Sequence, residues 1–230
     1  KHAMHIRDRN LTYPRYQAIA YLKPEASNGL YDNAELISRS LAGIRKNGLV
    51  KRLESSFFAF RKSIESFRQA NENMLTMWKN DKVFIAPDMD INLLIEKGLS
   101  EDEIEEKLNE KAEVNPKNAV FKREDFRPEY IDMLHQDQQI LDDMWLEWEY
   151  ITDDDDSKFA KFKELLNQEL FKKDRNPEGK IVVFSESVDT VEYLERRINR
   201  KDVLVISSHN RSQLFKTIRN NFDANWKEKK

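Results

Sequence analysis

The last quarter of the chain constrains the fold most, because two short apolar runs enclose one helix-length segment. The runs are Ile181–Phe184 and Val203–Ile206. Continuous β-branched runs of this length are typical of strands buried on both faces, as in a parallel sheet. Between them, apolar residues recur at helical spacing, at Val188, Val191, Leu194 and Ile198, with Ser187 placed to cap the helix. Because parallel strands need such a crossover, the pattern predicts a βαβ unit.

Two parallel strands cannot cover their own edges, so further strands are expected beside them. We therefore expect residues 156–230 to be the first part of a larger α/β domain that has been cut short. If its apolar sheet edges are exposed, the chain is expected to dimerise or to exchange elements through them.

Residues 1–155 are predicted to be a helical region, since glycine (5) and proline (6) are scarce. Helical apolar spacing and one capping box, Ser100–Glu103, predict helices over 31–44, 50–78, 100–108, 130–150 and 157–172. Gly48 is the expected break between the first two. Residues 13–22 are expected to be a short strand or extended, and 111–128 an irregular connector. The predicted fold class is mainly α with a C-terminal α/β portion.

Composition narrows the class of protein. The chain has no cysteine, which excludes disulfides and thiolate metal sites and fits a reducing compartment. No apolar run approaches the roughly 18–20 residues of a membrane span, so a cytoplasmic protein is expected. Residues 1–80 carry 14 basic and 7 acidic side chains, residues 81–160 carry 9 and 24, and residues 161–230 carry 16 and 11. Only the two ends are therefore expected to approach a polyanion.

No complete active site is visible in the sequence. Asp88 to Asn92 imitates the start of a calcium loop, but Leu93 stands where the turn glycine belongs. Asp153–Asp156 is interpreted as a solvated helix cap, and the four histidines are too scattered to predict a ligand set. Glu147 and Glu149 are interpreted as an exposed helix face rather than a carboxylate pair for glycoside hydrolysis. A G-x-x-x-x-G-K-[ST] phosphate loop is absent from the sequence.

Three segments in order carry a family resemblance. They are DSKFAKFKELL from Asp156, GKIVVFSES from Gly179, and the following helix with Tyr193-Leu194. This junction resembles the start of the second RecA-like lobe of Swi/Snf-type superfamily 2 helicases, where a strand ending in Phe-Ser is called motif IV. The earlier run LVKRLESSFFAFRK, from Leu49, is similar to a segment between the lobes of bacterial members.

The resemblance implies that the parent protein hydrolyses ATP with Mg²⁺ between two lobes and moves along nucleic acid, usually duplex DNA. Residues 1–155 would then be the helical inter-lobe region and 156–230 the first part of the second lobe. The family's phosphate loop and acidic motif would precede Lys1, and its arginine motif would follow Lys230. This chain alone is therefore expected to be catalytically inactive, with no catalytic residue, bound cofactor or metal of its own.

The expected nucleic-acid contacts are Ser185, Ser208, His209 and Arg211. Ser185 ends a predicted strand, and ligands of open α/β sheets bind outside the carboxyl ends of strands. Hydroxyl, imidazole and guanidinium groups are suitable donors to backbone phosphates. Helix capping explains Ser185 equally well and explains Ser207 better. The family commonly has a glycine and an arginine where this chain has Ser207–Asn210 and Phe215, which weakens the transfer of the loop's role.

A different class of function is also open. The long amphipathic helices and the acidic middle would suit a non-enzymatic helical adaptor that binds a protein partner. Strong, salt-sensitive binding to duplex DNA favours the motor interpretation, and binding to a protein partner without any effect of DNA favours the adaptor.

Overall fold

The structure is a computed structural model that describes residues 10–31, 33–208, 210–223 and 225. It is mainly helical, as predicted. The chain divides into two compact units, which are described separately. Among the described residues, unit 1 comprises those up to Glu54 together with Phe60–Thr152, and unit 2 comprises Ser55–Ala59 together with those from Asp153 onward.

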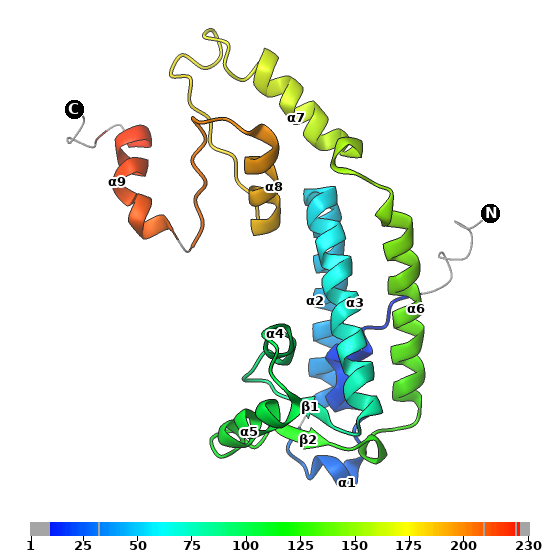
Figure 1. Ribbon diagram of the computed structural model, residues 1–230. Helices are drawn as coiled ribbons and strands as arrows, with labels where there is room; N and C mark the ends of the chain where they lie inside the picture. Colours follow the sequence, from blue (N-terminus) through cyan, green and yellow to red (C-terminus); the bar gives the residue numbers. More distant parts are fainter. Residues whose placement is uncertain (1–9, 32, 209, 224, 226–230) are drawn as a thin grey trace. The chain divides into compact units, whose positions relative to one another are not determined.

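Unit 1 holds most of the helices and the small sheet (Figure 1). Its elements are η3 (Pro14–Tyr21), α1 (Pro24–Ser27), most of α2 (Ala34–Ser55) and α3 (Phe57–Lys79), β1 (Val83–Ile85), α4 (Ile91–Glu96), α5 (Glu101–Ala112), β2 (Ala119–Phe121), η4 (Arg123–Asp125) and α6 (Glu129–Glu149).

Helices α3 and α6 pack antiparallel in unit 1. Asn71 near the middle of α3 donates to the Leu134 carbonyl at 2.9 Å, while Phe60 at its start meets Trp148 at the end of α6, with ring centroids 4.5 Å apart. Ile64 of α3 is fully buried in the same interface. The 3.6-residue apolar period of each helix thus supplies one buried face, as the sequence predicts.

A two-stranded antiparallel sheet lies at one end of unit 1 (Figure 1). Strand β1 pairs with β2 so that Val83 is opposite Phe121 and Ile85 opposite Ala119. Strand β2 and η4 lie within the predicted irregular connector, so that prediction is wrong in part. The capping box predicted at Ser100 is confirmed: its hydroxyl accepts from the Glu103 N–H, and the Glu103 carboxylate accepts from the Ser100 N–H at 2.8 Å.

The predicted strand or extended segment near residue 13 is instead the 3₁₀-helix η3. Pro14 occupies its first turn, where a missing N–H costs nothing. The buried Asp137 carboxylate of α6 accepts the N–H groups of Thr12 (2.9 Å) and Tyr13 (2.8 Å) and the Thr12 hydroxyl (3.1 Å). A contact 125 residues away therefore fixes the entry to this helix.

The break between the first two long helices is at Ser56, not at Gly48. Helix α2 continues through Gly48, since an isolated glycine weakens a helix by about 1 kcal/mol without ending it. Ser56 ends it because its hydroxyl accepts the Ala59 N–H at 3.1 Å and so caps α3.

Unit 2 contains η5 (Asp153–Asp155), α7 (Ser157–Gln168), α8 (Val188–Ile198) and α9 (Arg211–Phe222). The structure does not support the predicted parallel βαβ unit: helix α8 forms as expected, but Ile181–Phe184 and Val203–Ile206 on either side of it form no strand. Backbone groups of a strand need a paired neighbouring strand, and neither run pairs with one among the described residues. Most of their apolar side chains are exposed, with Phe184 at 91%.

Candidate functional site

The first predicted contact, Ser185, makes local hydrogen bonds at the start of α8. Its hydroxyl accepts from the Ser187 N–H at 3.1 Å and donates to the Ser187 carbonyl at 3.2 Å. The Ser187 hydroxyl in turn accepts from the Thr190 N–H at 3.2 Å, which makes Ser187 the N-cap that the sequence predicts. In this structure Ser185 therefore stabilises the turn before α8, which agrees with the capping interpretation.

The other predicted contacts lie in the turn before α9. The Asn210 side chain holds this turn: it accepts from the Ser207 N–H at 2.8 Å and donates to the Val205 carbonyl at 3.1 Å. Ser208 is exposed, and Arg211, also exposed, is the first residue of α9. His209 lies outside the described residues. The structure thus places Ser208 and Arg211 in one turn before α9, whereas Ser185 forms its hydrogen bonds within the turn before α8.

Three hydroxyl groups from distant parts of the chain form a polar cluster in unit 2. The hydroxyl of Thr190, on α8, lies 2.8 Å from the Ser55 hydroxyl and 3.0 Å from the Ser56 hydroxyl, at the break between α2 and α3. These residues are about 135 positions apart in the sequence. The contact therefore joins the short segment Ser55–Ala59 to the C-terminal part of the chain.

The carboxylate of Asp156 lies at the starts of both α7 and α3, where the segment Ser55–Ala59 meets the C-terminal part of the chain; we call this region the junction. Asp156 is only 2% exposed. It caps α7 by accepting the Phe159 N–H at 2.9 Å, and its second oxygen lies 3.5 Å from the Phe57 nitrogen, the first residue of α3. A helix N-terminus stabilises a negative charge, and this carboxylate lies at the N-termini of two helices. The prediction of a wholly solvated Asp153–Asp156 cap is therefore wrong for Asp156.

Three aromatic rings complete the junction. Tyr193 of α8 is 1% exposed and stacks on Phe58 with centroids 5.6 Å apart, while Phe159 of α7 meets it edge-on at 5.4 Å. Burial, followed by the charges of Asp156 and Asp153, raises the pKa of the Tyr193 phenol well above its usual value. The phenol is therefore neutral at physiological pH.

Two arginines cover these rings and pair with the acidic turn. The Arg196 guanidinium lies 4.7 Å from the Phe58 centroid and 3.0 Å from Asp153, and Arg197 lies 5.1 Å from the Phe159 centroid and 2.5 Å from Asp154. Arginine suits such sites because it stacks and forms ion pairs at once. The polar groups of the junction satisfy one another, so it is suited to hold segments together rather than to perform chemistry.

The segment that imitates a calcium loop has a structural role. Asp90 caps α4 by accepting the N–H groups of Asn92 (3.1 Å) and Leu93 (3.2 Å), which explains the calcium-loop imitation without an ion. Across the described part of the chain, no three His, Asp or Glu side chains gather as a metal site would need.

The sequence contains a local signal for each of the two segments that form this junction. Ser55-Ser56-Phe57-Phe58 interrupts a helical pattern with two hydroxyls followed by two rings, and Arg196-Arg197 follows Tyr193 by one turn. Only the tertiary structure shows that these two segments are in contact, because neither segment contains a pattern that identifies the other as its partner.

None of the helices in the described residues is both long enough and apolar enough to cross a bilayer. Comparisons with protein-family models, with curated proteins and with solved structures found no match to this chain.

Proposed function

We propose that this chain is part of an ATP-dependent Swi/Snf-type superfamily 2 helicase or DNA translocase. It would supply the helical inter-lobe region and the first part of the second motor lobe. One observation supports the proposal: Ser55–Ala59, part of the run from Leu49 that resembles the inter-lobe segment, belongs to the same compact unit as the segments that resemble the second lobe. Ser55 and Ser56, from that run, contact Thr190, in α8, at 2.8 and 3.0 Å.

The runs Ile181–Phe184 and Val203–Ile206 would be parallel strands of a complete lobe. Their order around α8 is that of a crossover unit, and several of their apolar side chains are exposed, with Val182 and Val183 at 55% and 52%. Strands supplied by the rest of the parent would pair with these backbones and bury these side chains.

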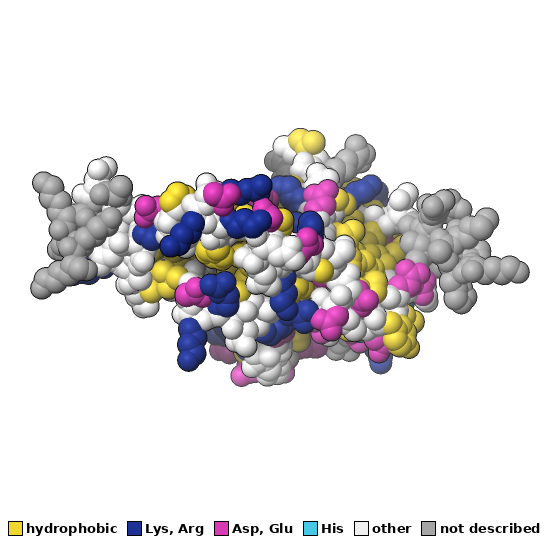
Figure 2. All heavy atoms as spheres, turned by 90° about the horizontal axis from the view of Figure 1, so that it is seen from above, with side chains coloured by type: hydrophobic (Ala, Val, Ile, Leu, Met, Phe, Trp, Pro, Cys, Tyr) yellow, Lys and Arg dark blue, Asp and Glu magenta, His cyan; other side chains and the backbone are white. Residues whose placement is uncertain are grey.

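The part played by this chain would be mechanical. ATP and Mg²⁺ would bind elsewhere in the parent, which would act in the cytoplasm, and ATP-driven closure would move it along duplex DNA. Ser185, Ser208, His209 and Arg211 would contact backbone phosphates without reading the sequence. Figure 2 shows many Lys and Arg side chains, with Asp and Glu side chains among them, on the face seen from above.

The first test is to determine the coding sequence on both sides of Lys1 and Lys230. A G-K-[ST] loop and a D-E-x-x motif upstream, with a Q-x-x-G-R-x-x-R-type motif downstream, are expected. Stop and start codons close to both ends would refute the motor proposal and favour the adaptor.

Binding to a fluorescently labelled duplex across a range of salt concentrations tests the contacts themselves. Each phosphate contact contributes about −0.9 to the slope of log K against log salt, so Arg211→Gln should reduce that slope by about 1. Lys107→Gln, at an exposed position of α5 in the acidic middle, is the matched control and should leave the slope unchanged. Equal effects of the two substitutions, or an affinity independent of salt, would contradict the proposed interface.

A further inference from the structure

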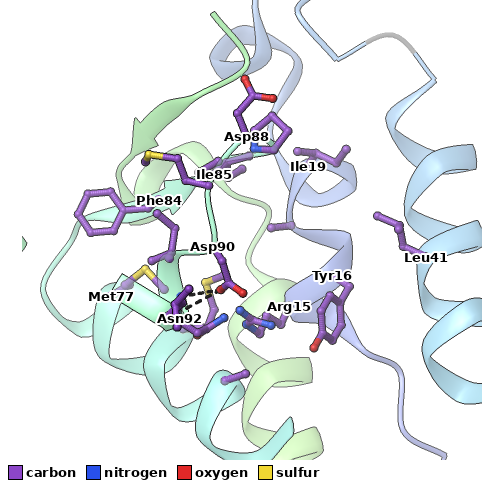
Figure 3. A pocket seen from close by; sticks show the side chains of 18 of the residues that line it. Arg15, Tyr16, Ile19, Leu41, Met77, Phe84, Ile85, Asp88, Asp90 and Asn92 are labelled. Carbon is purple, nitrogen blue, oxygen red and sulfur yellow. Dashed lines mark hydrogen bonds between the residues drawn. The ribbon is translucent and has the colours of Figure 1, made fainter. Parts of the chain in front are cut away.

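Unit 1 contains an open cavity of about 950 Å³ that the proposed motor function does not use. It lies among η3, α2, α3 and the segment from β1 to α4 (Figure 3). Its volume is at the upper end of the range of small-molecule sites in proteins. Met77 and Phe84 line one side, and Leu41 of α2 faces them from the other.

Two arginines reach this cavity and share one aromatic ring. The guanidinium carbon of Arg15, on η3, lies 4.9 Å from the centroid of the Tyr16 ring, and that of Arg45, on α2, lies 4.6 Å from the same centroid. Within the described residues, neither arginine pairs with a carboxylate, and the buried Arg15 Nε has no hydrogen-bond partner. Two guanidinium groups thus lie beside one aromatic ring, and the buried Arg15 Nε keeps a hydrogen-bond donor without a partner.

Two acidic side chains of the cavity, unlike Arg15 Nε, have hydrogen-bond partners. Asp88 accepts hydrogen bonds from the Asn115 and Asn118 side chains at 2.7 and 2.8 Å, and these bonds hold its pKa below the usual value. Asp90 is occupied as the cap of α4. Glu96 and Lys117, of opposite charge, also line the cavity. The lining thus contains carboxylates, but within the described residues none of them forms an ion pair with Arg15 or Arg45.

We propose that this cavity binds a small organic anion with an apolar body, of the alkyl or aryl carboxylate class. The head group accepts hydrogen bonds from Arg15 and Arg45, and the body packs on the side formed by Met74, Met77 and Phe84. A charge-assisted bond from arginine to a carboxylate is among the stronger polar contacts in proteins. Unbranched methionines adapt to bodies of different shape, so a class of ligands rather than one compound is expected.

Calorimetric titration of the full chain with decanoate, below its micelle concentration, tests the proposal. One molecule of decanoate should bind per chain. Decyltrimethylammonium, which has the same apolar tail and a cationic head, should bind at least tenfold more weakly. Equal binding of the two amphiphiles would overturn the proposal, because it would show that apolar surface alone is responsible.

Variants locate the site. Arg45 is exposed, so Arg45→Met should leave the fold intact, and it should weaken decanoate binding about tenfold, which corresponds to roughly 1.4 kcal/mol. Arg15→Met should have at least the same effect. Arg52→Met, on the same helix but outside the cavity lining, removes the same charge and should leave decanoate affinity unchanged. If Arg45→Met and Arg52→Met behave alike, the anion does not bind at this place.

Discussion

The Asp156 carboxylate should be the most sensitive single point of unit 2. Replacing it by alanine removes the cap of α7, which is worth about 1 kcal/mol, and a buried charge at a helix start, worth about another 1 kcal/mol. The Phe57 N–H at 3.5 Å is at the limit of hydrogen bonding and adds little. The expected loss in the free energy of unfolding is therefore about 2 kcal/mol.

Urea unfolding measures this loss. With a slope of about 1–2 kcal/mol/M for a unit of this size, the midpoint of Asp156→Ala should fall by about 1–2 M. Far-UV circular dichroism follows both units, whereas in a Trp226→Phe background the fluorescence of the remaining Trp78, Trp145 and Trp148 follows unit 1. If the units unfold separately, the shift should appear in the dichroism transition that the fluorescence does not share.

Two further variants make the reasoning refutable. Asp156→Asn keeps a capping oxygen and loses the charge, so it should show about half of the loss. Asp174→Ala removes the same charge from an exposed position in unit 2 and should shift the midpoint by less than about 0.3 M. Midpoints for Asp156→Ala and Asp174→Ala that agree within error would refute the role given to the buried carboxylate.

Three other predictions follow from the structure. Asp137→Ala leaves three donors of the η3 entry without their acceptor and should cost about 3 kcal/mol in urea unfolding, whereas Asp132→Ala, exposed on the same helix, should cost little. Burial raises the pKa of Tyr13 and Tyr31 from 10.0 to about 12. Their contribution to stability is therefore complete below pH 10 and is lost as the pH rises toward 12, because only the unfolded state ionises in that window; a tyrosinate absorbance titration in which every tyrosine ionises near pH 10 would contradict this. Val183→Lys places a charge in an exposed apolar run and should reduce any self-association seen by light scattering, and a wild-type chain that is monomeric at all concentrations would exclude dimerisation through this edge.

Features that depend on neighbouring residues were predictable from the sequence. The capping box at Ser100 and the N-cap at Ser187 each join groups three residues apart, so the local sequence contains both partners. The long helices α3 and α6 follow from apolar periodicity in the same way.

Features that depend on residues far away in the sequence could not be predicted from the sequence. The break at Ser56 is reinforced by Thr190, and the 3₁₀ form of η3 is held by Asp137, each more than 120 residues away. The predicted contacts Ser185, Ser208, His209 and Arg211 stay predictions, because their proposed role depends on nucleic acid and on strands outside this structure. The two arginines of the cavity come from separate segments, and no spacing along the chain relates Arg15 to Arg45.

The sequence by itself determined that this protein is mainly helical and where α5, α6, α7 and α8 begin, because helix signals are local: a 3.6-residue period and caps a few residues long. Only the tertiary structure decided that Ser55–Ala59 belongs with α8, that Asp156 is buried, and that Ile181–Phe184 has no strand partner among the described residues. The physical reason is that a β-strand, a buried carboxylate and a ring stack are each satisfied only by groups that the chain must bring from elsewhere.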